Sequence, residues 1–234
     1  MDAFLMIGQS NMAGRGDLND VPPIRNPHCF MLRMGRWQPM SEPINPDRPI
    51  FAGRFRSGVS LAASFADAYA RRFNREVGLI PCADGGTCLD EWLPGTVLFD
   101  HAVLMTRLAL RTSELKGILW HQGENDCTDP ADILAYPARF QTLVQGLRQA
   151  LQAPSLPVLA GELADPLAPA WKTEGREHIF NGQLAKLPEQ ISNLSIVPAA
   201  DLPLKDDGIH FNAASCRKLG LRYFDAYVAM TQPR

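Results

Sequence analysis

The sequence of 234 residues lacks a long apolar run, and no 18 consecutive apolar residues occur in it. A helix that crosses a bilayer needs about 20 such residues, so we expect no membrane contact. Charge of one sign is lacking too, since 23 Lys and Arg residues balance 25 Asp and Glu residues, for a net charge of -2. This balance argues against a nucleic-acid partner, because proteins that bind polyanions carry a basic excess.

Cysteine is scarce and scattered. The five cysteines are odd in number, and a chain of this length can bury enough surface to fold without disulfides, so we expect reduced thiols. Cys and His residues with the spacing of zinc ligands are absent. The glycine patterns that bind nucleotide phosphates, G-x-x-x-x-G-K-S/T and G-x-G-x-x-G, are absent as well. The sequence therefore predicts no metal and no other cofactor.

The first residues, MDAFLMIGQSNMAG, lack the basic segment and the long apolar stretch of a signal peptide. We therefore expect a cytoplasmic protein, or a secreted one if a leader preceded this sequence. Internal repeats, low-complexity segments and linker-like stretches are also absent. We predict a single domain over residues 1–234, a length that one domain can reach.

Short apolar runs alternate with longer stretches of helical period, which indicates a parallel sheet covered by helices on both faces. Five strands are expected, at residues 3–7, 77–81, 117–121, 157–161 and 194–197. Helices are expected near residues 61–73, 98–115, 131–152 and 212–230, the last capped by Asn212. The predicted fold class is α/β, a three-layer α/β/α sandwich with a five-stranded parallel sheet.

Residues 15–57 fit neither period. They are rich in Pro, Arg and Asn, so we expect a long loop, and long loops are often functional. Arg15, Arg54 and Arg56 flank it and are interpreted mainly as solvated side chains, with contact to a carboxylate or sugar as the alternative. Ser60 stands in a sequence that resembles a nucleophile elbow, but no buried strand precedes it, and we assign it to the start of a helix.

Four polar motifs follow predicted strands or precede the last helix: GQSNM at 8–12, ADGGT at 83–87, HQGEND at 121–126 and DGIH at 207–210. Ligands of open α/β sheets bind at the carboxyl ends of the strands. We therefore expect the four motifs to lie close together.

Two of these motifs carry the residue types of nucleophilic catalysis. Ser10 follows a strand and a glycine, where its hydroxyl can act as a nucleophile beside backbone donors of a helix N-terminus. Asp207 lies three residues before His210, a spacing that lets a carboxylate fix the tautomer of an imidazole. Each feature alone also fits a helix cap or a surface residue, since such caps are common.

The other two motifs offer hydrogen-bond donors. Gly85 and Gly86 present backbone N–H groups, and Asn125 and Gln122 present side-chain amides, which together could stabilise an oxyanion. A tight turn and an Asx turn or helix cap are the ordinary explanations of these residues.

Taken together, GQSNM, GGT, HQGEND and DGIH resemble the motifs of the SGNH hydrolases, most closely the branch of sialate O-acetylesterases and carbohydrate esterase family 6 acetylxylan esterases. The motifs span nearly the whole chain in the family order. The resemblance implies a flavodoxin-like α/β/α fold. It also implies that Ser10 is the nucleophile, that His210 acts as general base and acid, and that Asp207 orients His210.

The resemblance further implies an oxyanion hole formed by the Ser10 amide, a glycine amide and a side-chain amide. The glycine is Gly85 or Gly86. Asn125 matches the asparagine of the superfamily motif G-x-N-D, whereas the acetylesterase branch more often has serine or alanine there and shares Gln122. Both choices stay open.

A carbohydrate substrate is implied as well. Trp92 looks like a tryptophan of this branch and could stack on a sugar, and the alternative is a tryptophan packed in the core or on the surface. Gln9 and Glu124 are expected to contact substrate. We predict a serine esterase that removes acetyl groups from sugar hydroxyls through an acyl-enzyme. The alternatives are a carbohydrate-binding protein without turnover, and an esterase or thioesterase that acts on non-sugar acyl esters. The sequence leaves the sugar and the oligomeric state open.

Overall fold

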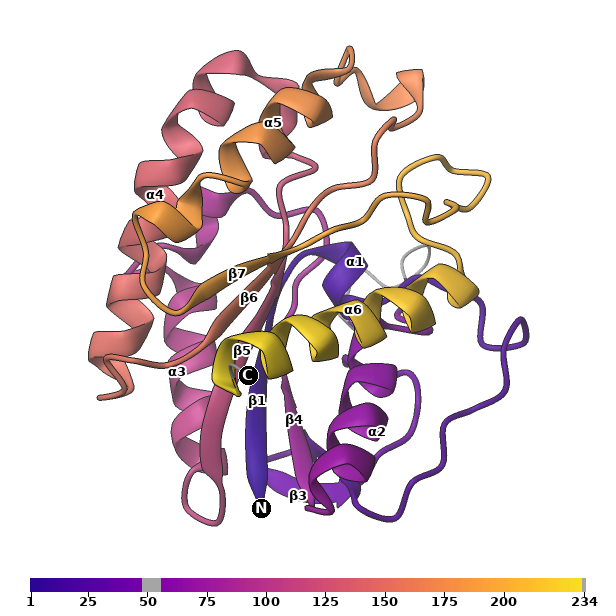
Figure 1. Ribbon diagram of the computed structural model, residues 1–234, viewed down its shortest axis with the longest axis vertical. Coiled ribbons are helices and arrows are strands. Elements are labelled where there is room, and N and C mark those ends of the chain that lie inside the picture. The colour runs from indigo at the N-terminus through magenta and orange to yellow at the C-terminus, as the bar shows by residue number, and fades with distance from the viewer. Residues whose placement is uncertain (48–55, 233–234) are drawn as a thin grey trace.

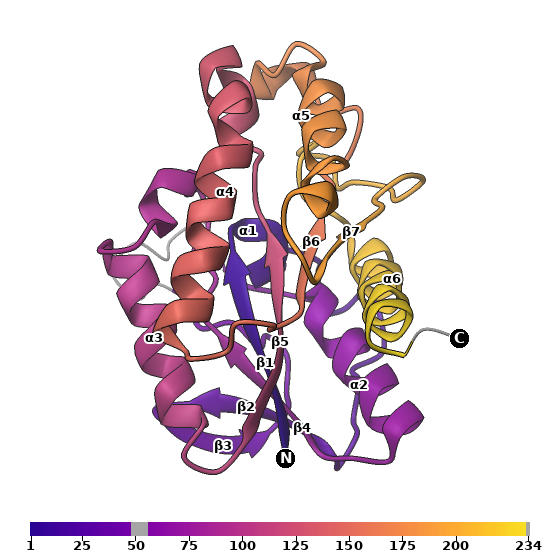
Figure 2. The same cartoon turned by 60° about the vertical axis from the view of Figure 1, so that its left-hand side comes forward.

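The computed structural model describes residues 1–47 and 56–232, which form three layers (Figure 1). The middle layer is a seven-stranded sheet with the order β3-β2-β4-β1-β5-β6-β7. Helices α2 (Leu61–Phe73) and α6 (Ala213–Thr231) cover one face, and α3 (Val97–Ala109) and α4 (Pro130–Ala150) cover the other (Figures 1 and 2). The α/β class and the layer order predicted from the sequence are confirmed.

The strands are β1 (Asp2–Gly8), β2 (Cys29–Arg33), β3 (Arg36–Pro39), β4 (Val77–Pro81), β5 (Glu114–His121), β6 (Val158–Gly161) and β7 (Leu194–Val197). Every neighbouring pair is parallel except β2 with β3. The remaining helices are α1 (Ser10–Ala13), α5 (Arg176–Leu184) and the short 3₁₀ turns η1 (Leu89–Trp92), η2 (Asp126–Thr128), η3 (Pro169–Trp171) and η4 (Leu187–Glu189). No helix in the described ranges combines the length and apolar character needed to cross a bilayer.

The prediction of five strands is wrong, because the segment expected to be a loop contains the hairpin β2–β3. Met34 and Gly35 join the two strands and both have positive φ, 50° and 71°, as in the tight turns that connect hairpin strands. Strand β3 is an edge strand with mostly exposed residues. An exposed edge strand shows no apolar run, and its sequence therefore resembles a loop.

The centre of the core lies at β1, in which every residue is buried. The ring of Phe4 packs edge-to-face on Phe65 of α2 and Tyr227 of α6, at centroid distances of 4.8 and 5.2 Å. Asn212 caps α6 as predicted, because its side chain accepts a hydrogen bond from the amide of Ser215 at 2.8 Å. All five cysteines are free thiols, as expected.

Helices α2 and α6 come close together at Gly220. A Cβ atom added there would lie 2.0 Å from the carbonyl oxygen of Leu61 and 2.1 Å from the Oγ atom of Ser64. Only a residue without a side chain fits between the two helices at this distance.

We expect Gly220→Ala to lower the free energy of unfolding by about 1–3 kcal/mol, because the helices must separate to admit the methyl group. Gly182→Ala in α5 is the matched control. No heavy atom outside the helix lies within 4 Å of the added Cβ, and alanine favours a helix over glycine by about 1 kcal/mol. Urea unfolding followed by circular dichroism measures both variants, and equal destabilisation of the two would contradict the prediction.

Candidate active site

The motifs predicted to lie together meet at the carboxyl ends of the three central strands, β4, β1 and β5. The amide of Gln9 donates to the carbonyl of His121 at 2.9 Å, and the amide of Asp84 donates to the carbonyl of Gly8 at 2.9 Å. These hydrogen bonds continue the sheet one step beyond each strand. They hold the first three motifs at fixed distances from one another.

Gly8 makes the turn that places Ser10 at the start of α1. Its φ is +126°, and an added Cβ would lie 2.2 Å from the carbonyl oxygen of His121. Glycine tolerates this backbone conformation, which lets β1 end against β5 and lets the chain turn into the helix. The side chain of Ser10 then faces a cavity of about 260 Å³ that Ser10 and His210 both line.

Ser10, His210 and Asp207 form a hydrogen-bonded chain at this cavity. The Oγ atom of Ser10 lies 2.9 Å from Nε2 of His210, and Nδ1 of His210 lies 2.9 Å from Oδ2 of Asp207. Oδ1 of Asp207 accepts hydrogen bonds from the amides of Ile209 and His210, at 3.1 and 3.0 Å. A carboxylate on Nδ1 keeps the proton on that nitrogen, so Nε2 is free to accept the serine proton.

The protonation states favoured by the surroundings suit this transfer. Burial lowers the pKa of His210, and the charges of Arg15 and Lys205 lower it further, against the opposing effect of Asp207. Burial alone would raise the pKa of Asp207, but the hydrogen bonds that it accepts from His210 and Ile209 outweigh burial and lower it. A neutral imidazole and an ionised carboxylate are therefore present together near neutral pH.

The candidate oxyanion donors lie beside Ser10. A Cβ atom added to Gly85 would lie 3.5 Å from Cβ of Ser10, whereas one added to Gly86 would meet nothing within 4 Å. Asn125 lines the same cavity, and its Nδ2 donates to the carbonyl of Gly86 at 3.0 Å. Gln9 also lines the cavity, with Nε2 at 3.5 Å from Oδ1 of Asn125. The geometry favours Gly85 and Asn125 as the donors.

Gln122 points away from the cavity, which contradicts its expected role as an oxyanion donor. Its side chain is fully buried. Nε2 donates to the carbonyl of Thr87 at 2.9 Å and to Oδ2 of Asp126 at 2.5 Å, and Oε1 accepts from the hydroxyl of Tyr136 at 3.0 Å. Gln122 thus supports the loops under the site.

Trp92 is also in the core, which contradicts its expected contact with a sugar. The indole is completely buried and packs edge-to-face on Trp120 at a centroid distance of 5.6 Å. Its N–H donates to Oγ1 of Thr87 at 3.0 Å. The alternative of a core tryptophan is the correct one.

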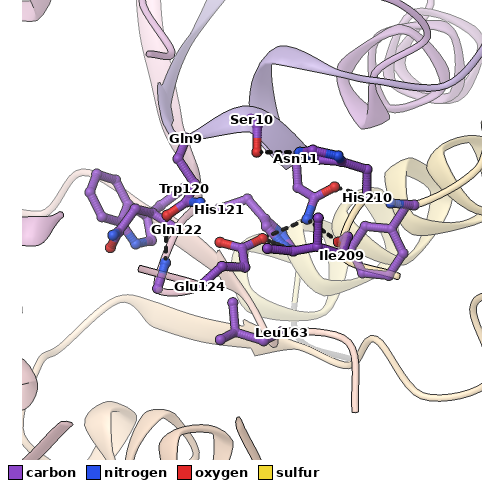
Figure 3. A network of polar contacts seen from close by, with 12 residues as sticks. Gln9, Ser10, Asn11, Trp120, His121, Gln122, Glu124, Leu163, Ile209 and His210 are labelled. Carbon is purple, nitrogen blue, oxygen red and sulfur yellow. Dashed lines mark hydrogen bonds and ion pairs between the residues drawn. The ribbon is translucent and has the colours of Figure 1, made fainter. Parts of the chain in front are cut away.

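Asn11 joins the first motif to the last one (Figure 3). Its Nδ2 donates to the carbonyl of Ile209 at 3.1 Å, and its Oδ1 accepts from the amide of Phe211 at 3.1 Å. These two residues flank His210. The same Nδ2 donates to Oε1 of Glu124 at 2.5 Å. Glu124 is buried behind Asn11, so the structure contradicts its expected contact with substrate.

Glu124 faces His121 in a closed interior (Figure 3), with 3.9 Å between Oε1 and Nε2. Burial raises the pKa of Glu124 to about 7 and lowers the pKa of His121 to about 3. The hydroxyl of Tyr223 donates to the carbonyl of Trp120 at 2.6 Å and lies 3.1 Å from Nδ1 of His121. Burial therefore favours neutral forms of both groups beneath the site.

Several cavity residues were not identified from the sequence. Asn45 holds the cavity wall to the end of β4, because its side chain accepts from the amide of Ala83 at 3.1 Å and donates to its carbonyl at 3.0 Å. Trp171 also lines the cavity, in a segment without any motif. The Pro- and Asn-rich composition of residues 15–57 was the one signal that pointed to Asn45.

The structure agrees with some of the remaining expectations, for the loop arginines and Ser60, and differs from others. Arg15 lines the cavity, contrary to its main interpretation as a solvated side chain, whereas Arg56 is exposed as expected and Arg54 lies outside the described residues. Ser60 occupies the N-cap position of α2, as predicted. Within residues 1–47 and 56–232, no three His, Cys, Asp or Glu side chains are grouped so that they could hold a metal ion.

We expect Glu124→Gln to change how stability depends on pH. A carboxyl group whose pKa rises from 4.5 to about 7 on folding binds extra protons in the folded state. Its contribution to the free energy of unfolding therefore falls as the pH rises from about 4.5 to about 7. Glutamine keeps the oxygen that accepts from Asn11 but does not titrate. The free energy of unfolding of the variant, minus that of the wild type, should rise by at least about 1 kcal/mol between pH 5 and 8 in urea titrations. A constant difference would contradict a raised pKa.

Comparisons with known proteins agree on the relatives of this chain. Residues 1–229 match the family described as carbohydrate esterase, sialic acid-specific acetylesterase. A probable carbohydrate esterase of Arabidopsis thaliana is 33% identical over 245 residues, which cover 97% of this chain and 90% of the relative.

Solved structures with similar folds include three that cover nearly the whole chain. A protein from Arabidopsis thaliana has a TM-score of 0.87 and 31% identity, covering 97% of this chain and 98% of that one. NanS has a TM-score of 0.77 and 19% identity, covering 99% and 98%. A carbohydrate acetylesterase from Xanthomonas citri has a TM-score of 0.65 and 20% identity, covering 100% and 57%. The last two likenesses show the shared fold.

Proposed function

Since this chain belongs to the carbohydrate esterase family described as sialic acid-specific acetylesterases, we propose that it removes acetyl groups from carbohydrate hydroxyls with Ser10 as nucleophile. The chain is thus a carboxylic ester hydrolase on the α/β/α fold of SGNH-type hydrolases. The observation that carries the proposal is the hydrogen-bonded chain from Ser10 through His210 to Asp207 at the wall of a cavity.

In the first half of the reaction, Oγ of Ser10 attacks the carbonyl carbon of the acetyl ester while Nε2 of His210 takes the serine proton. The tetrahedral intermediate then breaks its bond to the sugar oxygen, and His210 returns the proton to that oxygen. The sugar leaves with its hydroxyl restored, and the acetyl group stays on Ser10. Asp207 remains ionised and stabilises the imidazolium.

In the second half, water replaces the sugar. His210 takes a proton from the water as it attacks the acetyl carbon, and then returns the proton to Oγ of Ser10. Acetate leaves and the enzyme is restored. The amides of Ser10 and Gly85 and the side chain of Asn125 stabilise the negative oxygen in both halves, since they lie beside the nucleophile.

The two alternatives account less well for this geometry. A carbohydrate-binding protein without turnover has no need of a serine in contact with an imidazole that a carboxylate orients. An esterase for lipid-like acyl chains would be expected to have an apolar groove, whereas Arg15, Asp47 and Asp84 line this cavity. These charged side chains, set in a wall that also has apolar residues such as Ala83 and Ile209, can hydrogen-bond the hydroxyls of a sugar.

The proposal is tested by acetate release from acetylated xylan, O-acetyl sialic acid and an acetylated methyl glucoside. Wild type should release acetate from at least one of them, and Ser10→Ala should lose at least about a thousandfold in kcat. Mass spectrometry of the acid-quenched wild type should find acetyl on Ser10. Circular dichroism shows whether the variant is folded. Sugar binding by wild type without any acetate release would instead support a binding protein.

Asn125 and Gln122 are expected to respond differently to replacement by alanine. Asn125→Ala should lower kcat about a hundredfold or more with little change in the free energy of unfolding, because the side chain lines the cavity and its hydrogen bond to Gly86 is exposed to solvent. Gln122→Ala should lower the free energy of unfolding, because it leaves buried partners unsatisfied. Steady-state kinetics and urea unfolding of both variants separate the two roles. Near-wild-type turnover of Asn125→Ala would remove it from the oxyanion hole.

The pH profile of kcat/KM should reflect His210. The base works when neutral, so activity is lost as pH falls through its pKa, which burial lowers. We expect the midpoint of the acid limb below the ordinary value of about 6.5. Asp207→Asn removes the group that favours the charged imidazole, so this midpoint should move lower still while kcat falls by about 10³–10⁴. A profile that stays flat down to about pH 4.5 in the wild type would exclude His210 as the base.

A further inference from the structure

Trp171 is a large apolar side chain left partly open at the cavity. It belongs to the 3₁₀ turn η3, and it is 39% exposed. Of the cavity-lining residues in the described part of the chain, it is the only Phe, Tyr or Trp. An indole buries a large apolar area when a ligand covers it, and an exposed indole beside a nucleophile is therefore a candidate for contact with substrate.

The position of the indole is fixed relative to the catalytic groups. Its N–H donates to the carbonyl oxygen of Asp207 at 2.8 Å. Its ring meets the imidazole of His210 edge-to-face, with 6.5 Å between centroids and 74° between planes. The indole therefore lies next to His210 at the wall of the same cavity.

The segment that carries Trp171 is held on two sides. The amide of Ala168 donates to the carbonyl of Gly208 at 2.9 Å, and a Cβ on Gly208 would lie 2.2 Å from that of Ala168. Arg176 donates to the carbonyls of Lys172 and Thr128, at 2.9 and 2.8 Å. A ring fixed in this way can bind a flat surface with little loss of conformational entropy.

The reaction geometry decides which half of the ester meets Trp171. His210 returns its proton to the oxygen of the departing alcohol, so that alcohol must lie on the side of His210. The acetyl oxygen must lie on the other side, at Gly85 and Asn125. Since Trp171 packs against His210, it borders the alcohol half of the ester.

We propose that Trp171 determines specificity by stacking its indole on the sugar ring that carries the acetyl ester. This inference rests on the proposed function and deepens it, because it selects cyclic sugars over small or acyclic alcohols. The C–H groups on one face of a pyranose form an apolar surface that matches the face of an indole. Contact over that face would hold the ring while its oxygen remains next to His210.

The hydrogen bond to Asp207 gives the indole a second, structural role, and the experiment must separate the two. Two substrates with the same acyl group do so: the acetylated sugar that wild type cleaves fastest among those above, and ethyl acetate, which has no ring. Loss of support for Asp207 would slow both reactions alike. Loss of stacking would slow only the reaction of the sugar ester.

We expect Trp171→Ala to lower kcat/KM for the sugar ester about tenfold more than for ethyl acetate, chiefly through KM. Trp171→Phe, which keeps an aromatic face but has no N–H, should restore most of this discrimination. Val97→Ala, at an exposed residue of α3 outside the cavity, should leave the ratio of the two substrates unchanged.

Equal losses for both substrates in Trp171→Ala would overturn the inference and leave only the structural role. An unchanged ratio with unchanged rates would overturn it as well. Failure of the proposed function would look different, because wild type would then leave every acetylated sugar intact while it still hydrolysed ethyl acetate, or would hydrolyse neither.

Discussion

The side chain of Asn11 joins the segment that carries Ser10 to the segment that carries His210. Its amide binds the backbone on both sides of His210, and it directly follows Ser10. The separation of Ser10 and His210 is thus set by backbone hydrogen bonds to one buried side chain. The backbone amide of Phe211 and the carbonyl of Ile209 fix which end of the Asn11 amide donates, and Glu124 accepts from that same end. The remaining parts of the site are arranged around this distance.

Two carboxyl groups near Ser10 are held in opposite states by their surroundings. Asp207 accepts hydrogen bonds from two backbone amides and an imidazole, which favour its ionised form. Glu124 is enclosed, and burial favours its protonated form. The two imidazoles, His121 and His210, have different partners. His121 has a hydroxyl beside Nδ1, and His210 has a carboxylate. Pairs of similar groups with divergent environments mark acid–base sites, and here His210, which Asp207 orients, lines the cavity while His121 and Glu124 lie behind it.

Apolar runs located the central strands, because a strand buried on both faces has an apolar run whatever surrounds it. Strand β3 was not predicted, because most of its residues face solvent. The motifs placed Ser10 at a strand end and Asp207 and His210 before the last helix, but they could not give the direction of each side chain. Gly123 has a φ of +141° and turns the chain. Gln122 therefore enters the core, while Asn125, three residues after Gln122, reaches the cavity. Trp171 depends on contacts with a segment 36 residues away, which no local pattern encodes.

Ser10 and His210, the proposed nucleophile and base, stand 200 residues apart in the chain, with Ser10 at the start of α1 and His210 just before α6. During synthesis, Ser10 is made 200 residues before His210. Until the segment from His210 through α6 has been made and has packed against α2, the Ser10 hydroxyl lacks its imidazole partner. The proposed activity therefore depends on contact between segments that lie far apart in the sequence, and its onset during refolding would report that the first and last motifs have come together.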